Sequence, residues 1–395
     1  MLDFLLNFDI IPSEIKSEGI FMLAKIKTFI KKEVVFCISA LCAIATMFIV
    51  LPDREYIGYI DFHVLILLLC LMAVVAGFKS VGAFRWLTYQ LLRRTNSGRI
   101  LGVTLVLLPF FASMLVTNDV SLLVFVPFTM LLLSGLGCDK NIVPVIVLQT
   151  VAANLGSMAT PVGNPQNLFL YSAYSLGAGE FFGVTLPLTL VSLAGLGLFS
   201  VPILPRTLPK RELTKENITN GKYLALFAVL FVLCLLTVFR VMSHYILLAA
   251  IGLGFAILDK KTKYDVFKDV DFMLLLTFVC FFVVSGNLGR VDAVKEFLQS
   301  LLDKSTLLTS VATSQIISNV PAAVLLSGFT DNWQELLAGV NIGGLGTPVA
   351  SLASLITLKL YMNTKGAKVL KFLGIFTLAN IVGLIVLLVF EIICT

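Results

Sequence analysis

Residues 154–168 read NLGSMATPVGNPQNL, and residues 341–355 read NIGGLGTPVASLASL. Each stretch places Asn, Gly and Pro inside an otherwise apolar run, and the two align without a gap. Each also follows a hydroxyl–Asn pair, Thr117-Asn118 in the first case and Ser318-Asn319 in the second. The chain therefore contains an internal repeat. The matched positions are Asn154 with Asn341, Gly156 with Gly343, Thr160 with Thr347, Pro161 with Pro348, Val162 with Val349, and Leu168 with Leu355.

The composition is that of a membrane protein. Of 395 residues, 58% are hydrophobic and 13% are charged, whereas roughly a quarter of the residues in a soluble domain are charged. Apolar runs of about 20 residues, long enough to cross the hydrocarbon core of a bilayer, recur along the chain. The isoelectric point near 8.9 does not indicate nucleic-acid binding. The basic residues lie in short loops between apolar runs, where they orient the protein and contact anionic lipid.

The apolar runs predict an all-α polytopic membrane protein with two inverted repeats. We expect a cytoplasmic N-terminal arm at 1–32, a first repeat at 33–204, a cytoplasmic loop and linker helix at 205–242, and a second repeat at 243–392. Each repeat is expected to hold one re-entrant hairpin, at 100–135 and 305–335, and one broken helix that crosses the membrane, at 142–175 and 336–362. With the broken helices, about nine crossings are predicted; the others lie near 33–51, 58–77, 181–204, 222–240, 243–259, 268–288 and 370–392, and amphipathic pieces are expected near 80–97 and 290–303.

The distribution of positive charge supports this topology. With the N-terminus inside and both hairpins returning to the side they entered, 24 of the 29 Lys and Arg residues lie on the cytoplasmic side, as the positive-inside rule requires. The chain is then an integral protein of a prokaryotic plasma (inner) membrane, with its C-terminus outside. Inverted repeats with interrupted helices at matching positions are typical of secondary transporters, whose site lies at the midplane where the repeats meet.

The interruptions also carry the residues of helix starts. A polar residue followed by proline is a favoured start, and it occurs at Thr160-Pro161, Asn164-Pro165 and Thr347-Pro348, with Asn319 two residues before Pro321. Four half-helix N-termini near the midplane would attract an anion. Unwound carbonyls at 154–156 and 341–344 would suit a small cation such as sodium, and the glycines let the backbone turn or approach a ligand closely.

Asp119 is the one acidic residue predicted in the middle of the hydrocarbon region. Since a charge there is costly, we interpret it as a cation ligand or proton carrier; the alternative is an N-cap of the helix from Val120 that does not titrate. The candidate substrate- and ion-binding residues are Thr117, Asn118, Asp119, Asn154, Gly156, Thr160, Pro161, Gly163, Asn164, Asn167, Ser318, Asn319, Asn341, Gly343, Thr347, Pro348, Ser351 and Ser354; those that could bind sodium are Asn118, Asp119, Asn154, Asn319 and Asn341.

The sequence shows no motif of catalysis or of metal binding. The seven cysteines form no CxxC pair, and the two histidines, His63 and His244, lie far apart in the sequence, so no histidine-based metal site is expected. The chain has no HExxH, GxSxG or Walker A motif. We therefore predict neither enzymatic activity nor a cofactor, with a sodium ion as the one candidate bound ion.

The segments TNDVSLLVFVP, GSMATPVGNPQNLF, SNVPAAVLL and GGLGTPVASLASL resemble the ion transporter superfamily over about 33–392. That superfamily includes arsenite permeases, NhaD-type sodium–proton antiporters, citrate transporters and divalent anion:sodium symporters. The chain is most similar to its YbiR-type permeases. The resemblance implies a transport domain that moves against a scaffold in an elevator-like cycle, and a homodimer.

Symporters of this superfamily carry a Ser-Asn-Thr motif at the hairpin tips, which binds sodium and substrate carboxylate. The matching tips here are Thr117-Asn118-Asp119 and Ser318-Asn319-Val320. The added acid and the missing second hydroxyl depart from that motif and favour coupling through Asp119. Three functions stay open: a sodium- or proton-coupled carrier of a small inorganic or organic anion or oxyacid, a sodium–proton antiporter, and an efflux permease for a metalloid such as arsenite.

Overall fold

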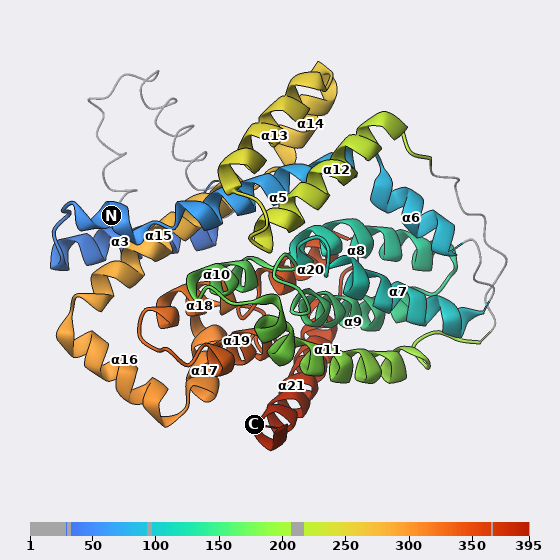
Figure 1. Ribbon diagram of the computed structural model, residues 1–395. Helices are drawn as coiled ribbons and strands as arrows, with labels where there is room; N and C mark the ends of the chain where they lie inside the picture. The colour runs from blue at the N-terminus through green and yellow to red at the C-terminus, as the bar shows by residue number, and fades with distance from the viewer. Residues whose placement is uncertain (1–28, 30–32, 93–96, 207–216, 365, 395) are drawn as a thin grey trace, which may run out of the picture.

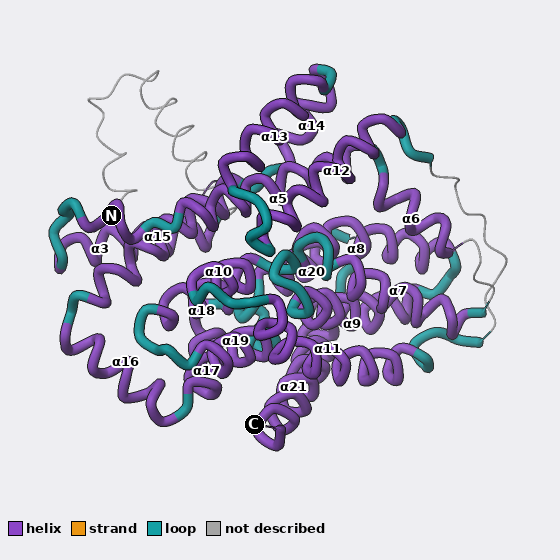
Figure 2. The backbone as a smooth tube through the Cα atoms, viewed as in Figure 1, coloured by secondary structure: helices purple, strands orange, loops and turns teal. Residues whose placement is uncertain are grey.

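The computed structural model describes residues 29, 33–92, 97–206, 217–364 and 366–394, and every regular element in them is a helix (Figure 1). Loops and turns join these helices (Figure 2). The prediction of an all-α chain is therefore confirmed. The predicted arm at 1–32 lies outside the described residues apart from Phe29, and so does 207–216 of the predicted cytoplasmic loop.

The helices form two layers (Figure 1). In the first, the α5/α15 layer, α3 packs on α15, and α5 packs on α12, α13 and α14. It comprises α3 (Val34–Ile49), α4 (Glu55–Tyr59), α5 (Phe62–Ser80), α12 (Gly221–Val238), α13 (His244–Ile257), α14 (Lys260–Asp269) and α15 (Phe272–Gly289).

The second, the α9/α19 layer, is assembled around α9, which packs on α7, α8, α11 and α21, and around α19, which packs on α17 and α18. It comprises α7 (Gly98–Ala112), α8 (Asn118–Gly135), α9 (Asp139–Ser157), α10 (Pro165–Ala173), α11 (Ala178–Ser200), α17 (Thr306–Ile317), α18 (Asn319–Ser327), α19 (Trp333–Ile342), α20 (Leu352–Met362) and α21 (Val369–Cys394).

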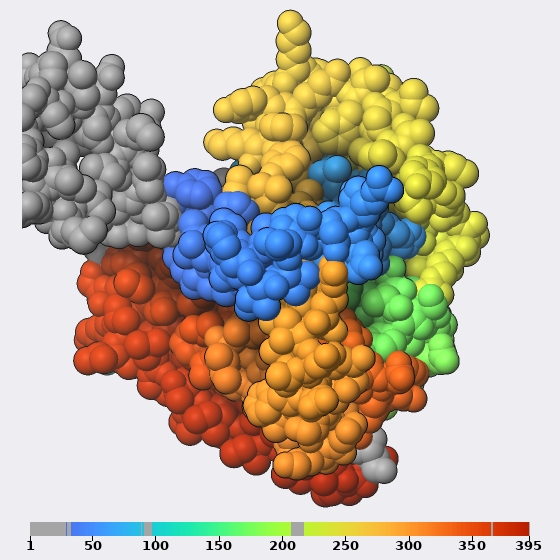
Figure 3. Space-filling model, turned by 90° about the vertical axis from the view of Figure 1, so that its left-hand side faces the viewer, coloured from blue at the N-terminus to red at the C-terminus, as the bar shows by residue number. Residues whose placement is uncertain are grey.

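Two short helices connect the layers at opposite edges. α6 (Ala83–Leu92) lies between α5 and α7, and α16 (Asp292–Lys304) lies between α15 and α17. Figure 3 faces the edge that carries α16, whose orange residues descend from the blue residues of the first layer toward the red C-terminal helices. Both helices fall in the stretches predicted to be amphipathic.

Six segments are long and apolar enough to cross a membrane: Phe62–Ser80, Asn118–Gly135, Ala178–Ser200, Gly221–Val238, Lys260–Gly289 and Val369–Cys394. Five more apolar helices are shorter, among them α3 and α13. Large apolar side chains such as Phe48, Leu131 and Leu370 are at least three-quarters exposed, which an aqueous surface does not favour and a lipid surface does. The chain is thus an integral membrane protein; the count of about nine crossings stays a prediction.

The predicted segments match helices to within a few residues, with one correction. The basic stretch 260–268, which the sequence suggests is a loop between two spans, forms α14, because Asp259 caps the helix by accepting from the backbone N–H groups of Lys261 and Thr262. The two predicted helix interruptions are present. One separates α9 from α10, and the other separates α19 from α20.

Candidate functional site

Two turns between helices form the centre of the α9/α19 layer. The first turn, residues 158–164, follows α9, and the second turn, residues 343–351, follows α19. Two further helix pairs end beside them, α7 with α8 and α17 with α18. The N-termini of α8, α10, α18 and α20 are therefore the four helix starts near this centre.

The helix pairs contact the turns through corresponding backbone bonds. The N–H of Asn118 donates to the carbonyl of Gly163 (3.2 Å), and the N–H of Asn319 donates to the carbonyl of Ala350 (3.0 Å). In the aligned repeat, Gly163 and Ala350 occupy the same position. The first residues of α8 and α18 are thus each bound to the turn that follows them in the sequence.

Two threonine hydroxyls make a second matched pair of bonds. Thr160 donates to the carbonyl of Met114, and Thr347 donates to the carbonyl of Gln315. The Ser318 hydroxyl, next to the second tip, donates to the Ala350 carbonyl (3.2 Å). These predicted site residues therefore hold the ends of α7 and α17 and the start of α18 to the turns, and their hydroxyls already donate to backbone carbonyls.

Asn154, near the end of α9, connects α8 to the second turn and the start of α20. Its Oδ1 accepts from Asn118 Nδ2 (3.0 Å) and from the Ser351 hydroxyl (3.0 Å), and its Nδ2 lies 3.5 Å from the Ser354 hydroxyl. The reciprocal contact comes from Asn341, whose Nδ2 donates to Asn167 Oδ1 (2.7 Å). Because Asn154 aligns with Asn341 and Asn167 with Ser354, each half contacts the other through the same two positions.

One predicted helix start agrees with the structure, and three others differ from it. α10 starts at Asn164-Pro165 as predicted, with Asn164 Oδ1 accepting from the N–H of Asn167 (3.1 Å). Thr160-Pro161 and Thr347-Pro348 do not start helices, because α10 and α20 begin at Pro165 and Leu352. The N-cap interpretation of Asp119 is also wrong, since Asn118 is already the first residue of α8 and Thr117 holds the cap position.

Two glycines of the predicted site leave room for a neighbouring helix. A Cβ at Gly156 would lie 2.1 Å from the carbonyl oxygen of Phe110 in α7, and a Cβ at Gly343 would lie 2.7 Å from Ser314 Cβ in α17. Close helix packing therefore explains Gly156 and Gly343, and the space beside each is filled. Gly163 is confined in the same way by the carbonyl oxygen of Ser157.

Two of the five predicted sodium ligands have a fully buried oxygen without a hydrogen-bond partner. Asp119 Oδ1 and Asn341 Oδ1 are both buried and accept no hydrogen bond. By contrast, Asn118 Oδ1 accepts from the N–H of Asp119 (2.9 Å), and Asn154 Oδ1 accepts two bonds. A buried oxygen without a donor is costly, so these two oxygens could accept from water or bind a cation.

The carboxylate of Asp119 lines a cavity of about 570 Å³ between the two layers. α5, the start of α8, and the α14–α15 junction form its walls, and Val162 of the first turn and Pro165 of α10 also line it. Lys79 and Asp269 pair across it at 3.0 Å. Its ionisable lining is Glu33, Asp119, Asp269 and Asp271 on the acidic side and Lys79 and Lys268 on the basic side.

A smaller cavity of about 300 Å³ lies at the opposite ends of the same helices. Asp61, Phe169, Tyr174 and Phe282 are in its lining, with Tyr59 beside them. The Tyr174 hydroxyl donates to the carbonyl of Thr330 (2.7 Å). This cavity reaches Val324 of α18 but includes neither Ser318 nor Asn319.

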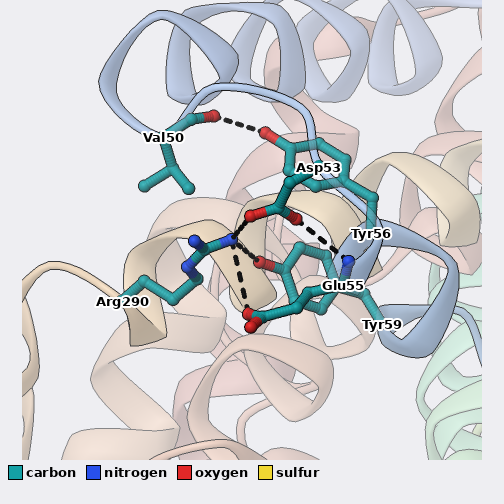
Figure 4. A network of polar contacts seen from close by, with 6 residues as sticks. All are labelled: Val50, Asp53, Glu55, Tyr56, Tyr59 and Arg290. Carbon is teal, nitrogen blue, oxygen red and sulfur yellow. Dashed lines mark hydrogen bonds and ion pairs between the residues drawn. The ribbon is translucent and has the colours of Figure 1, made fainter.

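Tyr59 is fixed in place at the smaller cavity. Its ring lies 2.4 Å from where a Cβ of Gly286 would be, so α4 packs directly on the backbone of α15. Arg290 Nη1 donates to the Tyr59 hydroxyl (3.0 Å) and pairs with Asp53 (2.7 Å) and Glu55 (3.5 Å), as Figure 4 shows. The Arg290 guanidinium lowers the pKa of Asp53.

Sequence reasoning missed Ser157, Gln315 and Asp271. Ser157 accepts from Asn164 Nδ2 (3.0 Å), and Gln315 Nε2 donates to the carbonyls of Gly343 (2.8 Å) and Leu345 (2.9 Å). A glutamine within an apolar hairpin was the available signal for Gln315. The position of Asp271 near a span end suggests a solvated residue, although it lines the same cavity as Asp119.

An all-helical membrane protein with interrupted helices and a polar centre is the architecture of a secondary transporter. Comparison with known proteins agrees: the family described as CitMHS, citrate transporter, matches residues 20–333. The chain belongs to this family, which is one of transporters and not of enzymes. The predicted membership in the ion transporter superfamily is confirmed.

Individual relatives support the same class. The chain is 35% identical to an uncharacterized transporter of Methanocaldococcus jannaschii, over 86% of this chain and 92% of the relative. It is 29% identical to the inner membrane protein YbiR of Escherichia coli, over 80% and 84%. It is also 32% identical to the silicon efflux transporter LSI3 of rice, Oryza sativa subsp. japonica, over 38% and 30%. The predicted likeness to YbiR-type permeases is confirmed.

Proposed function

We propose that this protein is a secondary active transporter that moves a small anion or oxyacid together with sodium ions or protons. The observation that carries the proposal is the cavity that ends at Asp119, whose Oδ1 has no partner. A group that binds and releases a cation must reach solution from one side at a time, and this carboxylate faces the larger cavity. The four helix N-termini around the turns supply positive dipole ends for an anion.

The proposed architecture is two inverted repeats, each with one re-entrant hairpin and one broken helix. The matched bonds at Asn118 and Asn319, and the reciprocal contacts of Asn154 and Asn341, support it. In the proposed elevator cycle, the α9/α19 layer moves against the α5/α15 layer. The larger cavity contains Lys79 and Lys268, so the positive-inside rule assigns it to the cytoplasm, with the N-terminus inside and the C-terminus outside. A prokaryotic inner membrane and a homodimer complete the proposal.

A second candidate function is sodium–proton antiport. The acidic groups that line the larger cavity outnumber the basic ones, and Lys79 is already paired with Asp269. Such a lining attracts cations and repels anions. A metalloid efflux permease is the third candidate, and the name of the rice relative supports an oxyacid of silicon or a similar element as its cargo.

Ligand-dependent thermal stability of the purified full chain tests these functions. The panel is sodium against potassium at several pH values, then citrate, sulfate, phosphate, arsenite and silicic acid. A ligand at about 100 times its Kd stabilises the folded state by about 2.7 kcal/mol. We expect a sodium- or pH-dependent rise in melting temperature that Asp119→Asn abolishes and the matched control Asp292→Asn, on exposed α16, retains.

The outcomes separate the candidates. A further rise with one anion supports the coupled carrier, whereas cation effects without any anion response support the antiporter. A response to silicic acid or arsenite alone, independent of sodium and pH, supports the metalloid permease. A sodium or pH response that is unchanged in Asp119→Asn would refute the role given to this carboxylate.

A further inference from the structure

The two histidines of the chain form a pair. His63 is the second residue of α5 and His244 is the first residue of α13, 181 positions later, yet their Nδ1 atoms lie 2.8 Å apart. The rings are nearly perpendicular, with an angle of 82° and centroids 4.7 Å apart. Since the chain has only these two histidines among its 395 residues, the fold brings together every imidazole that it contains.

This contact depends on protonation. Two Nδ1 atoms at hydrogen-bond distance need one N–H donor and one lone-pair acceptor. A neutral pair and a singly protonated pair both satisfy that requirement, whereas two imidazolium rings present two donors and repel each other. Within the part of the chain that the structure describes, no third His, Cys, Asp or Glu joins them as a metal-binding group. A shared proton therefore explains the geometry better than a shared metal.

The surrounding charges favour one proton on the pair over two. Asp61, the N-cap of α5, is the nearby acid, and its Oδ1 already accepts from the N–H of Val64 (3.0 Å). Arg240 is the nearby base, on the turn between α12 and α13. Both histidines lie at helix N-termini, where the dipole opposes added positive charge. The ring of Tyr245 lies against His244 with centroids 4.1 Å apart.

The turn that precedes His244 also contacts the end of α10. Arg240 donates from Nη1 to the carbonyl of Ser175 (2.8 Å) and from Nη2 to the carbonyl of Tyr171 (3.0 Å), and its guanidinium lies 5.4 Å from the Tyr171 ring centroid. Arg240 and Ser175 both have left-handed backbone, with φ of 60° and 55°. Such conformations persist only where neighbouring contacts hold them, so this contact depends on the position of the turn.

We propose that His63 and His244 form a proton-operated latch, which holds the α12–α13 turn against α5 and thereby keeps Arg240 on the end of α10. Double protonation separates α13 from α5 and moves the turn, and Arg240 then releases the carbonyls of Tyr171 and Ser175. α10 directly follows the first turn of the central site. Double protonation of the histidine pair therefore loosens the contact that holds α10 and makes the first turn more mobile. The effect on transport rests on the proposed function, whereas the latch itself does not.

Hydrogen exchange of the full chain in lipid nanodiscs tests the latch without a transport assay. After correction for intrinsic rates, amide exchange in segments 171–176 and 238–247 is expected to rise about three- to ten-fold between about pH 7.5 and about pH 4.5. The range extends below that of an isolated histidine because the second proton binds against the charge of the first. His63→Gln keeps a hydrogen-bonding partner for His244 but cannot form two imidazolium rings, so it should remove the pH dependence. His244→Gln is the second variant, in case the first does not fold.

Two controls complete the test. Arg240→Gln should raise exchange at 171–176 at both pH values while the pH response of 238–247 remains. Segments of α21, far from the pair, should not respond. The same pH response in wild type and in either histidine variant would overturn the proposal, and so would exchange at 171–176 that does not change with pH in the wild type. A transport defect has no bearing on these readings, so failure of the latch and failure of the proposed function are distinguishable.

Discussion

The turn after α9 and the turn after α19 carry closely related sequences but lie in different surroundings. Between positions 158 and 168, every residue except Thr160 is buried. In the second turn, Thr347 is exposed and Val349 is 48% exposed. The first turn is covered because α10 packs against α5, whereas α20 packs on α8 and α9. Related sequences therefore do not ensure equal environments.

The two cavities show the same inequality. Ile356 lines the larger cavity, and Phe169, at the aligned position, lines the smaller one. Asp271 and Asp61 also correspond, since each caps its helix by accepting from the N–H three residues later. At about 570 Å³ the larger cavity reaches the tip of α8, whereas at about 300 Å³ the smaller one stops short of the tip of α18. Related halves therefore line cavities of unequal size, and only the larger of these two reaches a helix start at the centre.

The largest effect is expected from the paired glycines. Gly156→Ala should destabilise the protein by about 3 kcal/mol, because the Phe110 carbonyl belongs to the backbone of α7 and cannot move away alone. Gly343→Ala, where Ser314 is the neighbour, should cost about half as much. Reversible unfolding in mixed micelles measures both values. Equal costs would show that the two halves pack alike, against the comparison made above.

The next effect concerns the paired asparagines. Asn154→Ala leaves Asn118 Nδ2 and the Ser351 hydroxyl without their acceptor, so it should cost about 2 kcal/mol. Asn341→Ala removes the donor to Asn167, but it also removes a buried oxygen that has no hydrogen-bond partner. The loss of stability should therefore be about 1 kcal/mol or less. Unfolding free energies of the two variants test this order. If Asn341 Oδ1 binds the cation, its variant alone should also lose the sodium-dependent rise in melting temperature.

A smaller effect is expected from the paired tyrosines Tyr174 and Tyr361, which differ in the reach of their hydroxyls. The hydroxyl of Tyr174 donates to Thr330, 156 positions away, whereas that of Tyr361 accepts from the N–H of Lys368, only seven away. Tyr174→Phe should therefore cost about 1 kcal/mol and Tyr361→Phe about half of that. Thermal unfolding of both variants beside wild type measures the difference, and a reversed order would contradict it.

The smallest effect is expected at the exposed ion pair of Arg290 and Asp53, beside the smaller cavity. Arg290 lowers the pKa of Asp53 in the folded state, so the pair stabilises the fold above the pKa of an unfolded Asp, about 3.9, and that stability is lost as the pH falls through the lower folded value. Asp53→Asn should slightly lower the melting temperature at neutral pH and not at about pH 2. Asp292→Asn serves as the control, and a loss of equal size at both pH values would rule out the ion pair as its cause.

Much of the fold could be predicted from the sequence. Apolar runs of helical length set the helices, and clusters of Asn, Gly and Pro set the interruptions after α9 and α19, because both signals act within a few residues. The pairing of Thr117-Asn118 and Ser318-Asn319 with the turns was also predictable, since the repeat placed each pair before its own turn. The exact helix starts were not, because Thr160 and Thr347 bond to the carbonyls of Met114 and Gln315 instead of capping a helix.

By itself, the sequence determined the class of protein, the repeat and the polar residues that gather at its centre. Only the tertiary structure decided that Asn154 contacts Ser354, that Asp271 faces the cavity of Asp119, and that His63 meets His244. These contacts join residues about 150 to 200 positions apart, and their existence depends on how the two layers pack. The inequality of the two cavities has the same origin, because the size of a cavity between the layers depends on how the layers pack and not on the sequence of either half alone.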